Sequence, residues 1–222
     1  MPSPAACLFD LDGLLLDTEP LHSQAWLEAA SAFGLTLEPD QLLALRGRRR
    51  LDCAEQVRQW MQHSGRAVPS VEALLAVRQP IAEVLLPQAL PMPGAMSLIA
   101  ACQQHGIPMA LVTSSSRSAV ALKEAPHPWL AAIDLRVHGD DPELTAGKPS
   151  PDPYLLAAQR LQVEASACWA FEDSPAGATA ATAAGCRVFV LLPADGRDSA
   201  VVSAQLPASC LTLQSLDQVL LA

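Results

Sequence analysis

Positive charge is scarce in this sequence. Lysine and arginine together number 14 against 23 aspartates and glutamates, which gives a formal net charge of −9. A surface that binds nucleic acid or an anionic membrane needs a basic patch to neutralise phosphates, and no such excess is present. We therefore expect neither nucleic acid nor a membrane among the partners, and any bound phosphate must be held by a few local groups.

Long apolar runs and paired cysteines are also missing. The first residues, MPSPAACLFDLD, lack a basic region, and Asp10 and Asp12 interrupt their apolar run, so they predict neither a signal peptide nor a membrane span. The six cysteines are dispersed without a CxxC motif or Cys/His ligand spacing, which is typical of buried thiols in a reducing compartment. We expect a cytoplasmic protein, and a monomer by default.

Aromatic residues make up only 4% of the chain, whereas half of the residues are hydrophobic, so the core should be built from Leu, Ala and Val. The 222 residues suffice for one large domain or for a domain that carries a smaller insertion. Short apolar runs that end in polar or small residues predict buried parallel strands, over 5–9, 109–112, 133–137, 168–171 and 187–192.

Helical segments separate the later strands. The first covers 97–105 and stops at Gly106, while Asp152-Pro153 and Ser174-Pro175 each offer a cap and a first-turn proline for a following helix. Strand alternating with helix predicts an α/β fold with a doubly wound, Rossmann-like parallel sheet.

Residues 19–90 break this alternation, because they contain several helical patterns and no convincing strand. One predicted helix covers 52–62, and another starts at Ser70, although Pro80 should kink or split it. The proline-rich stretch LPMPGA then marks the return to the sheet. We predict a core domain of residues 1–18 and 91–222 with an inserted α-helical cap domain of residues 19–90.

Polar side chains gather in four stretches that follow predicted strands. These stretches are Asp10-Leu11-Asp12-Gly13, Thr113 to Ser116, Gly147-Lys148-Pro149 and Glu172-Asp173-Ser174. In an open parallel sheet, ligands bind at the carboxyl ends of the strands. Two close carboxylates favour a cation between them, a helix N-terminus favours an anion, and a lysine would neutralise a transferring phosphate.

Each of the four stretches also has a plain structural explanation. The first suits an Asp-Gly turn with solvated acids, the second a serine helix cap, the third a solvated lysine, and the fourth a cap formed by Asp173 or Ser174. These explanations do not account for all four stretches occurring in order, each after a predicted strand.

The combination resembles the haloacid dehalogenase-like hydrolase superfamily over nearly the whole chain. DLDGLLLDTE, LVTSS, GKPSPDPY and FEDSPAG are similar to the four family motifs, in the family's order. The layout resembles the branch with a helical cap after the first motif. Within it, five stretches are similar to the pseudouridine-5'-phosphatase group: DGLLLDTE, HGIPMALVTSS, GDDPE, GKPSPDPY and FEDSPAG. The chain also resembles sugar-phosphate and glycerol-3-phosphate phosphatases.

The resemblance implies a magnesium-dependent phosphatase that hydrolyses a small sugar, nucleoside or polyol phosphate through an aspartyl-phosphate. Asp10 falls on the family's nucleophile and Asp12 on its general acid/base. The presence of an acid at Asp12 argues against dehalogenase chemistry, because family members with that activity lack it.

The ligand sets are implied in the same way. Mg²⁺ would be held by the Asp10 carboxylate, the Asp12 backbone carbonyl and Asp173, with Glu172 as a further ligand or neighbour. Thr113, Ser114 and Lys148 fall on the positions that bind the phosphoryl group. In the cap, His22 on the first helix and Arg50 in the loop RRR are the candidates for substrate contact, although a solvated basic loop explains the arginines equally well.

Two alternatives stay open. A β-phosphoglucomutase-like phosphosugar mutase shares the core motifs, but the mutases use a cap lysine, and lysine occurs only at positions 123 and 148 in this chain. The lack of a lysine in residues 19–90 favours hydrolysis, although Arg50 or Arg78 could take the place of that lysine. The same absence argues against phosphonate cleavage. A catalytically silent binding module would be expected to have lost Asp10, Asp12, Lys148 or Asp173, and none is lost.

Overall fold

The computed structural model describes residues 3–46, 48–65, 67–194 and 196–221. In these ranges six strands form a single parallel sheet in the order β3-β2-β1-β4-β5-β6. The strands are β1 (Ala6–Phe9), β2 (Met109–Val112), β3 (Leu135–Val137), β4 (Cys168–Glu172), β5 (Arg187–Leu191) and β6 (Leu211–Leu213). The predicted doubly wound α/β fold is confirmed, and β6 is a strand that the apolar pattern did not predict.

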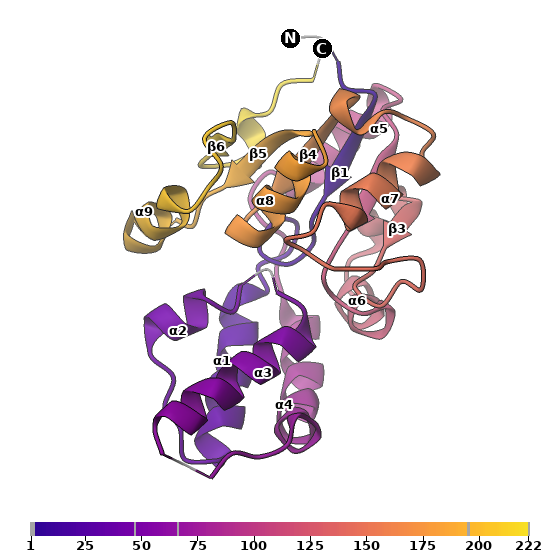
Figure 1. Cartoon of the computed structure of the whole chain (residues 1–222). Coiled ribbons are helices and arrows are strands. Elements are labelled where there is room, and N and C mark those ends of the chain that lie inside the picture. The colour runs from indigo at the N-terminus through magenta and orange to yellow at the C-terminus, as the bar shows by residue number, and fades with distance from the viewer. Residues whose placement is uncertain (1–2, 47, 66, 195, 222) are drawn as a thin grey trace.

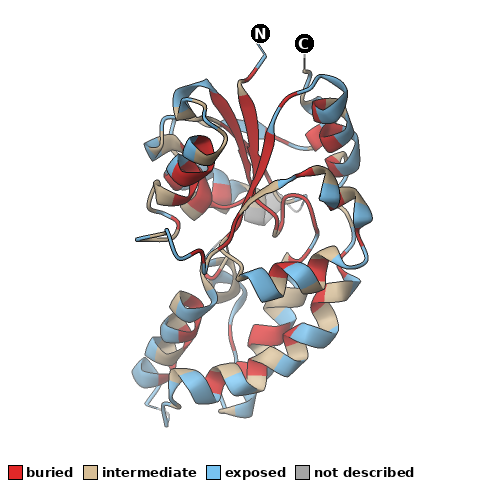
Figure 2. Ribbon diagram, turned by 90° about the vertical axis from the view of Figure 1, so that its right-hand side faces the viewer, coloured by how far each residue is buried: buried red, intermediate tan, exposed pale blue. Residues whose placement is uncertain are grey.

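Helices cover both faces of the sheet (Figure 1). Cys7 and Phe9 pack into one hydrophobic cluster with α5 (Ala95–Gln104), whereas Ala6 and Leu8 pack into a second with α7 (Asp152–Arg160) and α8 (Pro175–Ala183). Successive side chains of a strand point to opposite faces, so a strand covered on both sides must be apolar throughout. Figure 2 shows the resulting buried strands between exposed helix surfaces.

Four helices lie together below the sheet in Figure 1: α1 (Glu19–Ala32), α2 (Pro39–Leu43), α3 (Arg50–His63) and α4 (Val71–Leu85). They bury a cluster of their own that includes Trp26, Val57, Met61 and Leu74. None of the helices in the described ranges is both long and apolar enough to cross a bilayer.

The predicted break at Pro80 is wrong insofar as α4 is not split and continues to Leu85. Proline removes one backbone donor and leaves the carbonyl four residues earlier without its helical partner. Pro80 and Ala76 are both exposed, so water can satisfy that carbonyl. Leu74 and Ala82, on either side of the proline, are buried and hold the helix in place.

The two regions are joined by chain segments that pair beside the carboxyl end of β1. Leu16 forms an antiparallel bridge with Pro91, and the Asp17 N–H donates to the Leu90 carbonyl at 2.8 Å. Leu14, Leu15 and Leu16 are fully buried in the cluster that also contains Phe9. The chain therefore enters and leaves the four-helix region at one anchored crossing, directly beside Asp10 and Asp12.

Two helix starts test the sequence predictions. The Ser174 hydroxyl accepts a hydrogen bond from the Gly177 N–H at 3.1 Å, so the predicted cap of α8 is confirmed. The predicted cap by Asp152 is wrong, because Pro151 occupies the cap position of α7. The Asp152 carboxylate instead accepts from the Ala146 N–H and the Ser150 hydroxyl, which holds the loop that carries Lys148.

Candidate active site

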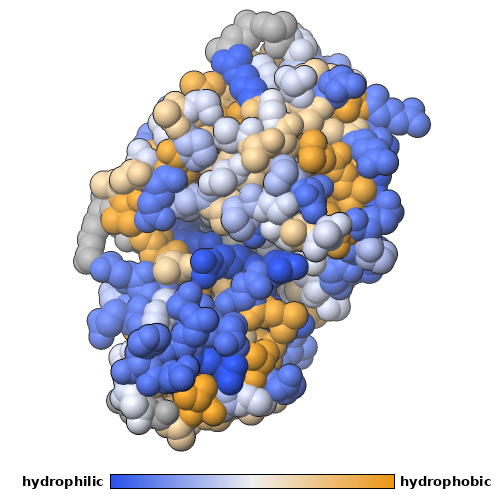
Figure 3. Space-filling model, in the orientation of Figure 1, coloured by the Kyte–Doolittle hydropathy of each residue, from blue (hydrophilic) through white to orange (hydrophobic). Residues whose placement is uncertain are grey.

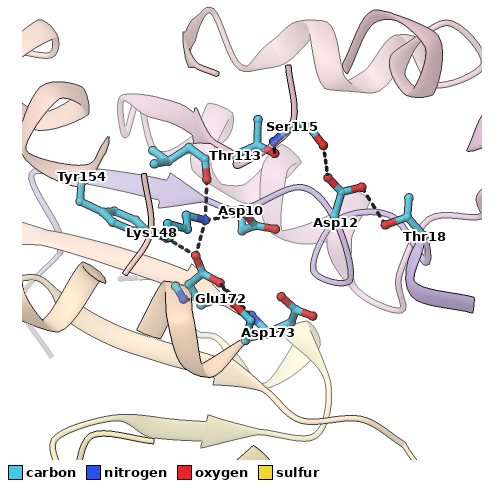
Figure 4. A network of polar contacts seen from close by, with 12 residues as sticks. Asp10, Asp12, Thr18, Thr113, Ser115, Lys148, Tyr154, Glu172 and Asp173 are labelled. Atoms are coloured by element: carbon cyan, nitrogen blue, oxygen red, sulfur yellow. Dashed lines mark hydrogen bonds and ion pairs between the residues drawn. The ribbon is translucent and has the colours of Figure 1, made fainter. Parts of the chain in front are cut away.

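Asp10, Thr113 and Asp173 each follow the last residue of a strand or lie next to it, at the carboxyl ends of β1, β2 and β4 (Figure 4). The Asp10 N–H donates to the Phe171 carbonyl at 3.0 Å, and the Thr113 N–H donates to the Val137 carbonyl at 3.0 Å. Because these strands are neighbours in the sheet, the backbone ladder itself brings the three side chains to one edge.

A glycine completes the turn after Asp12. Gly13 has a φ of 82°, which lies in the left-handed region that side chains disfavour. A Cβ at this position would also overlap the Asp173 carboxylate. Gly13 therefore lets the backbone turn directly after Asp12, and it leaves room for the Asp173 carboxylate.

Lys148 lies between two buried carboxylates. Its Nζ is 2.6 Å from Asp10 Oδ1 and 2.5 Å from Glu172 Oε1, and it also donates to the Val112 carbonyl at 2.9 Å. The Tyr154 hydroxyl donates to the same Glu172 oxygen, and burial raises the pKa of Tyr154 well above its usual value, so that the hydroxyl keeps its proton. Lys148, Glu172 and Tyr154 together fix one side of Asp10.

Asp10, Glu172 and Asp173 form a group whose oxygens lie within 4.8 Å of one another. Both carboxylate oxygens of Asp173 are buried without a hydrogen-bond partner. Arg46 is the nearby cation, with its Nη2 3.8 Å from Asp173 Oδ2 and its Nε 3.1 Å from Glu19 Oε2. A buried, unsatisfied carboxylate among oxygen donors fits a hard divalent cation such as Mg²⁺.

The charge balance supports the same conclusion. Four carboxylates, from Asp10, Glu19, Glu172 and Asp173, face two cations, so full ionisation leaves two negative charges in a buried space. Burial raises the pKa of Asp10 to about 7 despite Lys148, and burial with repulsion from Glu19 raises the pKa of Asp173 well above its usual value. A divalent cation would offset those two charges and favour the ionised acids.

Asp12 lies in a different environment from Asp10. Its Oδ1 accepts from the Thr18 hydroxyl at 2.8 Å, its Oδ2 accepts from the Ser115 hydroxyl at 2.8 Å, and Lys123 Nζ is 2.6 Å from both oxygens. Burial would raise the pKa of Asp12, but Lys123 and His22 hold it well below its usual value. Two aspartates separated by one residue therefore have pKa values shifted in opposite directions.

The loop after β2 forms the opposite wall. Thr113 is buried, and its hydroxyl oxygen accepts a hydrogen bond from the Ser115 N–H at 3.1 Å. The hydroxyl can therefore still donate its own proton to a bound group. Ser114 lines the cavity in front of Asp10, and helix α6 (Arg117–Glu124) starts directly after this loop. Of the predicted phosphate-binding residues, Lys148 contacts Asp10, Ser114 lines the same cavity, and Thr113 follows the neighbouring strand β2.

A cavity of about 260 Å³ lies between the sheet edge and the four helices. Asp10, Asp12 and Ser114 line it from the sheet side, and His22 and Arg50 line it from the helices. Figure 3 shows the hydrophilic residues gathered at this narrow middle of the molecule and over the lower lobe. Both cap candidates therefore reach the cavity.

The two cap candidates differ in how they are held. His22 Nε2 lies 3.3 Å from Asp12 Oδ1, and its Nδ1 lies 2.9 Å from Arg78 Nη2. Arg50 is exposed and donates to the Gln79 side chain at 2.7 Å. His22 is thus part of the polar network around Asp12, whereas Arg50 lies at the rim of the cavity.

Sequence reasoning missed several residues of this network. Lys123, Ser115 and Thr18 contact Asp12, Tyr154 contacts Glu172, and Arg46 links Glu19 to Asp173. A signal was available for two of them, because Lys123 is one of only two lysines and Tyr154 is the only tyrosine in the chain. Arg46 and Ser115 stand among other arginines and serines, so composition could not single them out.

The chain is similar to known proteins in sequence and in fold. The family model for haloacid dehalogenase-like hydrolases matches residues 4–185. A probable pseudouridine-5'-phosphatase of Drosophila melanogaster is 36% identical over 194 residues, covering 84% of this chain and 80% of that protein. Hexitol phosphatase A of Escherichia coli is 32% identical over 220 residues, covering 96% of this chain and 91% of that protein.

Among solved structures, a β-phosphoglucomutase of Clostridium difficile superposes with a TM-score of 0.80 over 98% of this chain and 93% of its own. Its sequence identity is 19%, so this likeness concerns the fold.

Proposed function

The chain belongs to the haloacid dehalogenase-like hydrolase family and is a phosphoric monoester hydrolase; from this premise we propose that it is a magnesium-dependent phosphatase acting through an aspartyl-phosphate. The observation that carries the proposal is the pair Asp10 and Asp12. The Asp10 carboxylate lies beside Lys148 and the other acids, whereas the Asp12 carboxylate accepts from a separate set of donors. Both aspartates line one cavity. One reaction needs both roles, a nucleophile and an acid/base.

Asp10 is the nucleophile in this proposal. Its carboxylate attacks phosphorus, the bond from phosphorus to the ester oxygen breaks, and the acyl phosphate that results is labile to water. Lys148 offsets the negative charge of Asp10 and of the incoming phosphate from a distance of 2.6 Å. The Thr113 hydroxyl and the backbone N–H of Ser114 bind the transferring oxygens.

Asp12 is the general acid and base. It protonates the ester oxygen as the alcohol leaves, and it then takes a proton from the water that hydrolyses the aspartyl-phosphate. The donors around Asp12 favour its ionised form, which suits the second step. For the first step Asp12 must be protonated. It either receives the proton from a protonated phosphate group of the substrate or takes one up before the substrate binds.

Magnesium would be held by the Asp10 carboxylate, the Asp12 backbone carbonyl and Asp173, with Glu172 beside them. When bound, it lets an anionic carboxylate approach an anionic phosphate. The support for this ligand set is the buried, unsatisfied Asp173 and the excess of two negative charges around it.

The helices of residues 19–90 form the cap in this proposal, and they close the cavity above the phosphate. Sugar, nucleoside or polyol monophosphates are the proposed substrates, in line with the pseudouridine-5'-phosphatase and hexitol phosphatase relatives. His22 and Arg50 contact the alcohol part of the ester. Their polar side chains suit hydroxylated substrates better than apolar ones.

A screen of phosphate release over many esters with Mg²⁺ tests the proposal, with Asp10→Asn as the matched inactive variant. We expect metal-dependent release from several polyol or sugar phosphates, and loss of at least about 10³-fold in the variant. Glucose 1-phosphate with a bisphosphate primer belongs in the same screen. Isomerisation to glucose 6-phosphate without phosphate release would favour a mutase, and no turnover of any ester would favour a silent binding module.

A further inference from the structure

Lys123 is fully buried on α6, outside all four motifs that carry the proposed chemistry. Its Nζ lies 2.6 Å from Oδ1 of Asp12, 2.6 Å from Oδ2 of Asp12 and 2.8 Å from the Ser115 hydroxyl oxygen. A fully buried lysine is rare, and it is tolerated only where its charge is paired. Asp12 supplies this pairing for Lys123.

The Asp12 carboxylate has more donors than it needs. Thr18, His22 and Lys123 contact Oδ1, while Ser115 and Lys123 contact Oδ2. An ionised carboxylate offers about four lone-pair sites, so five contacts fix both its position and its plane. Lys123 is the one donor among the described residues that contacts both oxygens, and it therefore controls rotation about the bond to the carboxylate.

Each of the two lysines of the chain contacts one of the two aspartates. Lys148 contacts Asp10 and Glu172, and Lys123 contacts Asp12 and Ser115. Asp12 also lines the cavity together with Ser115 and His22, so its carboxylate is held at the cavity wall. A purely structural ion pair would have no reason to end at the one carboxylate that must meet the leaving oxygen.

We propose that Lys123 is a positioning residue for ester cleavage, which fixes the plane of the Asp12 carboxylate so that it meets the leaving oxygen. The inference rests on the proposed function, because Asp12 needs this orientation only if it gives a proton to the leaving oxygen of a phosphate ester. It adds a residue of α6 to the machinery, and it assigns Lys123 a role distinct from that of Lys148.

The test uses the dependence on the leaving group. An alkyl alcohol is a poor leaving group and needs proton transfer, whereas 4-nitrophenolate leaves without it. In Lys123→Met, we expect kcat/KM for the best alkyl ester of the screen to fall on the order of 10²-fold, and kcat/KM for 4-nitrophenyl phosphate to change only a few-fold. The ratio kcat/KM is used because it reports the step in which the alcohol leaves.

Lys148→Met is the matched control. It removes the other buried lysine, which contacts Asp10, and it should lower kcat/KM for both esters alike. A loss in Lys123→Met that is equal for both esters, or no loss, would overturn the positioning role. Absence of phosphatase activity in the unaltered protein would instead overturn the proposed function, so the two failures are distinguishable.

A buried charge left without its partner can prevent folding. If Lys123→Met does not fold, Ser115→Ala decides the question, because it removes a neutral donor from the same Oδ2 atom and leaves the ion pair in place. A selective loss for the alkyl ester, smaller than in the lysine variant, supports the proposal. An unchanged ratio between the two esters overturns it.

Discussion

The Arg78 guanidinium donates a hydrogen bond to Nδ1 of His22 across 2.9 Å. Because arginine carries only donors, Nδ1 must be the accepting nitrogen, and the neutral ring then carries its proton on Nε2, which faces Asp12 Oδ1 at 3.3 Å. Burial lowers the pKa of Arg78 to about 10, so the guanidinium is still charged near neutral pH. Hydrogen-bonding groups thus connect Arg78 of α4 through His22 to Asp12, the proposed acid.

Replacing Arg78 by methionine should separate activity from stability. Arg78 is buried, its Nε has no hydrogen-bond partner, and its guanidinium packs 4.4 Å above the Trp26 ring. Replacing a buried charge by an apolar side chain of similar length is often neutral or stabilising. We expect an unchanged or higher melting temperature and a fall in kcat/KM on the order of 10-fold, since His22 loses its fixed tautomer.

Arg187→Met is the control for that variant. Arg187 also packs on aromatic rings, those of Trp169 and Phe189, but it lies at the start of β5, away from the carboxyl ends of the strands. Its replacement should leave kcat/KM unchanged. A large drop in melting temperature for Arg78→Met would contradict the expectation, because the guanidinium would then contribute mainly to packing.

Magnesium should stabilise the folded protein through Asp173. A ligand at about 100 times its Kd adds roughly 2.7 kcal/mol to the free energy of unfolding, so thermal melting with and without Mg²⁺ should differ by several degrees. In Asp173→Asn this shift should disappear, while the melting temperature without metal rises, because a buried acid with a strongly raised pKa has been removed. Asp52→Asn, at a half-buried acid of α3 that pairs with Arg49, should keep the full shift. A persistent shift in Asp173→Asn would argue against Asp173 as a ligand.

Gly177 makes room for Glu172, and a single methyl group tests this. A Cβ at Gly177 would overlap the Glu172 carboxylate, which also contacts Lys148 and Tyr154. We expect Gly177→Ala to lower stability by about 1–3 kcal/mol, or about 2–4 °C in melting temperature for each kcal/mol, and to weaken the stabilisation by Mg²⁺. Thr179→Ala, exposed on the same helix, should change neither property measurably. If Gly177→Ala melts at the temperature of the unaltered protein, Glu172 can move freely and the expectation is wrong.

A pH-dependent contribution to stability is expected from Asp141. Its carboxylate accepts two hydrogen bonds from Arg160, at 2.7 and 2.9 Å, and these lower its pKa from the usual value of 3.8. The unfolded chain therefore binds this proton more readily than the folded one, so the contribution is complete above pH 3.8 and is lost as the pH falls through the lowered folded value.

Urea unfolding of Asp141→Asn measures that contribution. Near neutral pH the variant should be less stable by about 1–2 kcal/mol, and the difference should shrink as the pH falls below the usual carboxylate pKa. Glu143→Gln removes the exposed partner of Arg160 and should cost no more than about 0.5 kcal/mol. A difference that stays constant down to acid pH would mean that the introduced amide disturbs packing and that the charge of Asp141 is unimportant.

The parts of the fold that follow from local pattern were predictable. A strand buried on both faces is apolar throughout, and β2 coincides with its predicted range 109–112. β6 was missed because only Leu213 of its three residues is buried, so its sequence carries little apolar signal. The Asp152 cap was mispredicted because that carboxylate serves the loop before it, a contact that a reading of the helix alone does not contain.

In the candidate site too, the residues within local motifs were predictable and those brought in by distant contacts were not. Asp10, Lys148 and Asp173 stand in recognisable stretches of sequence, and the sheet brings them together. Lys123 could not be assigned from its own neighbours, since its partner Asp12 is 111 residues away in the chain. Arg46 likewise contacts Asp173 only because the helical region folds back over the strand ends. Contacts between the two regions depend on tertiary packing, which periodicity does not encode.

The burial of both lysines has a practical consequence for handling the protein. With 0% of Lys123 and 4% of Lys148 exposed, the folded chain presents no accessible lysine amine. Amine-reactive dyes, cross-linkers and lysine-specific proteases should therefore leave its lysines untouched until the site opens. The rate at which those two amines become labelled, measured by mass spectrometry, then reports how often the candidate site opens, and the measurement needs no substrate.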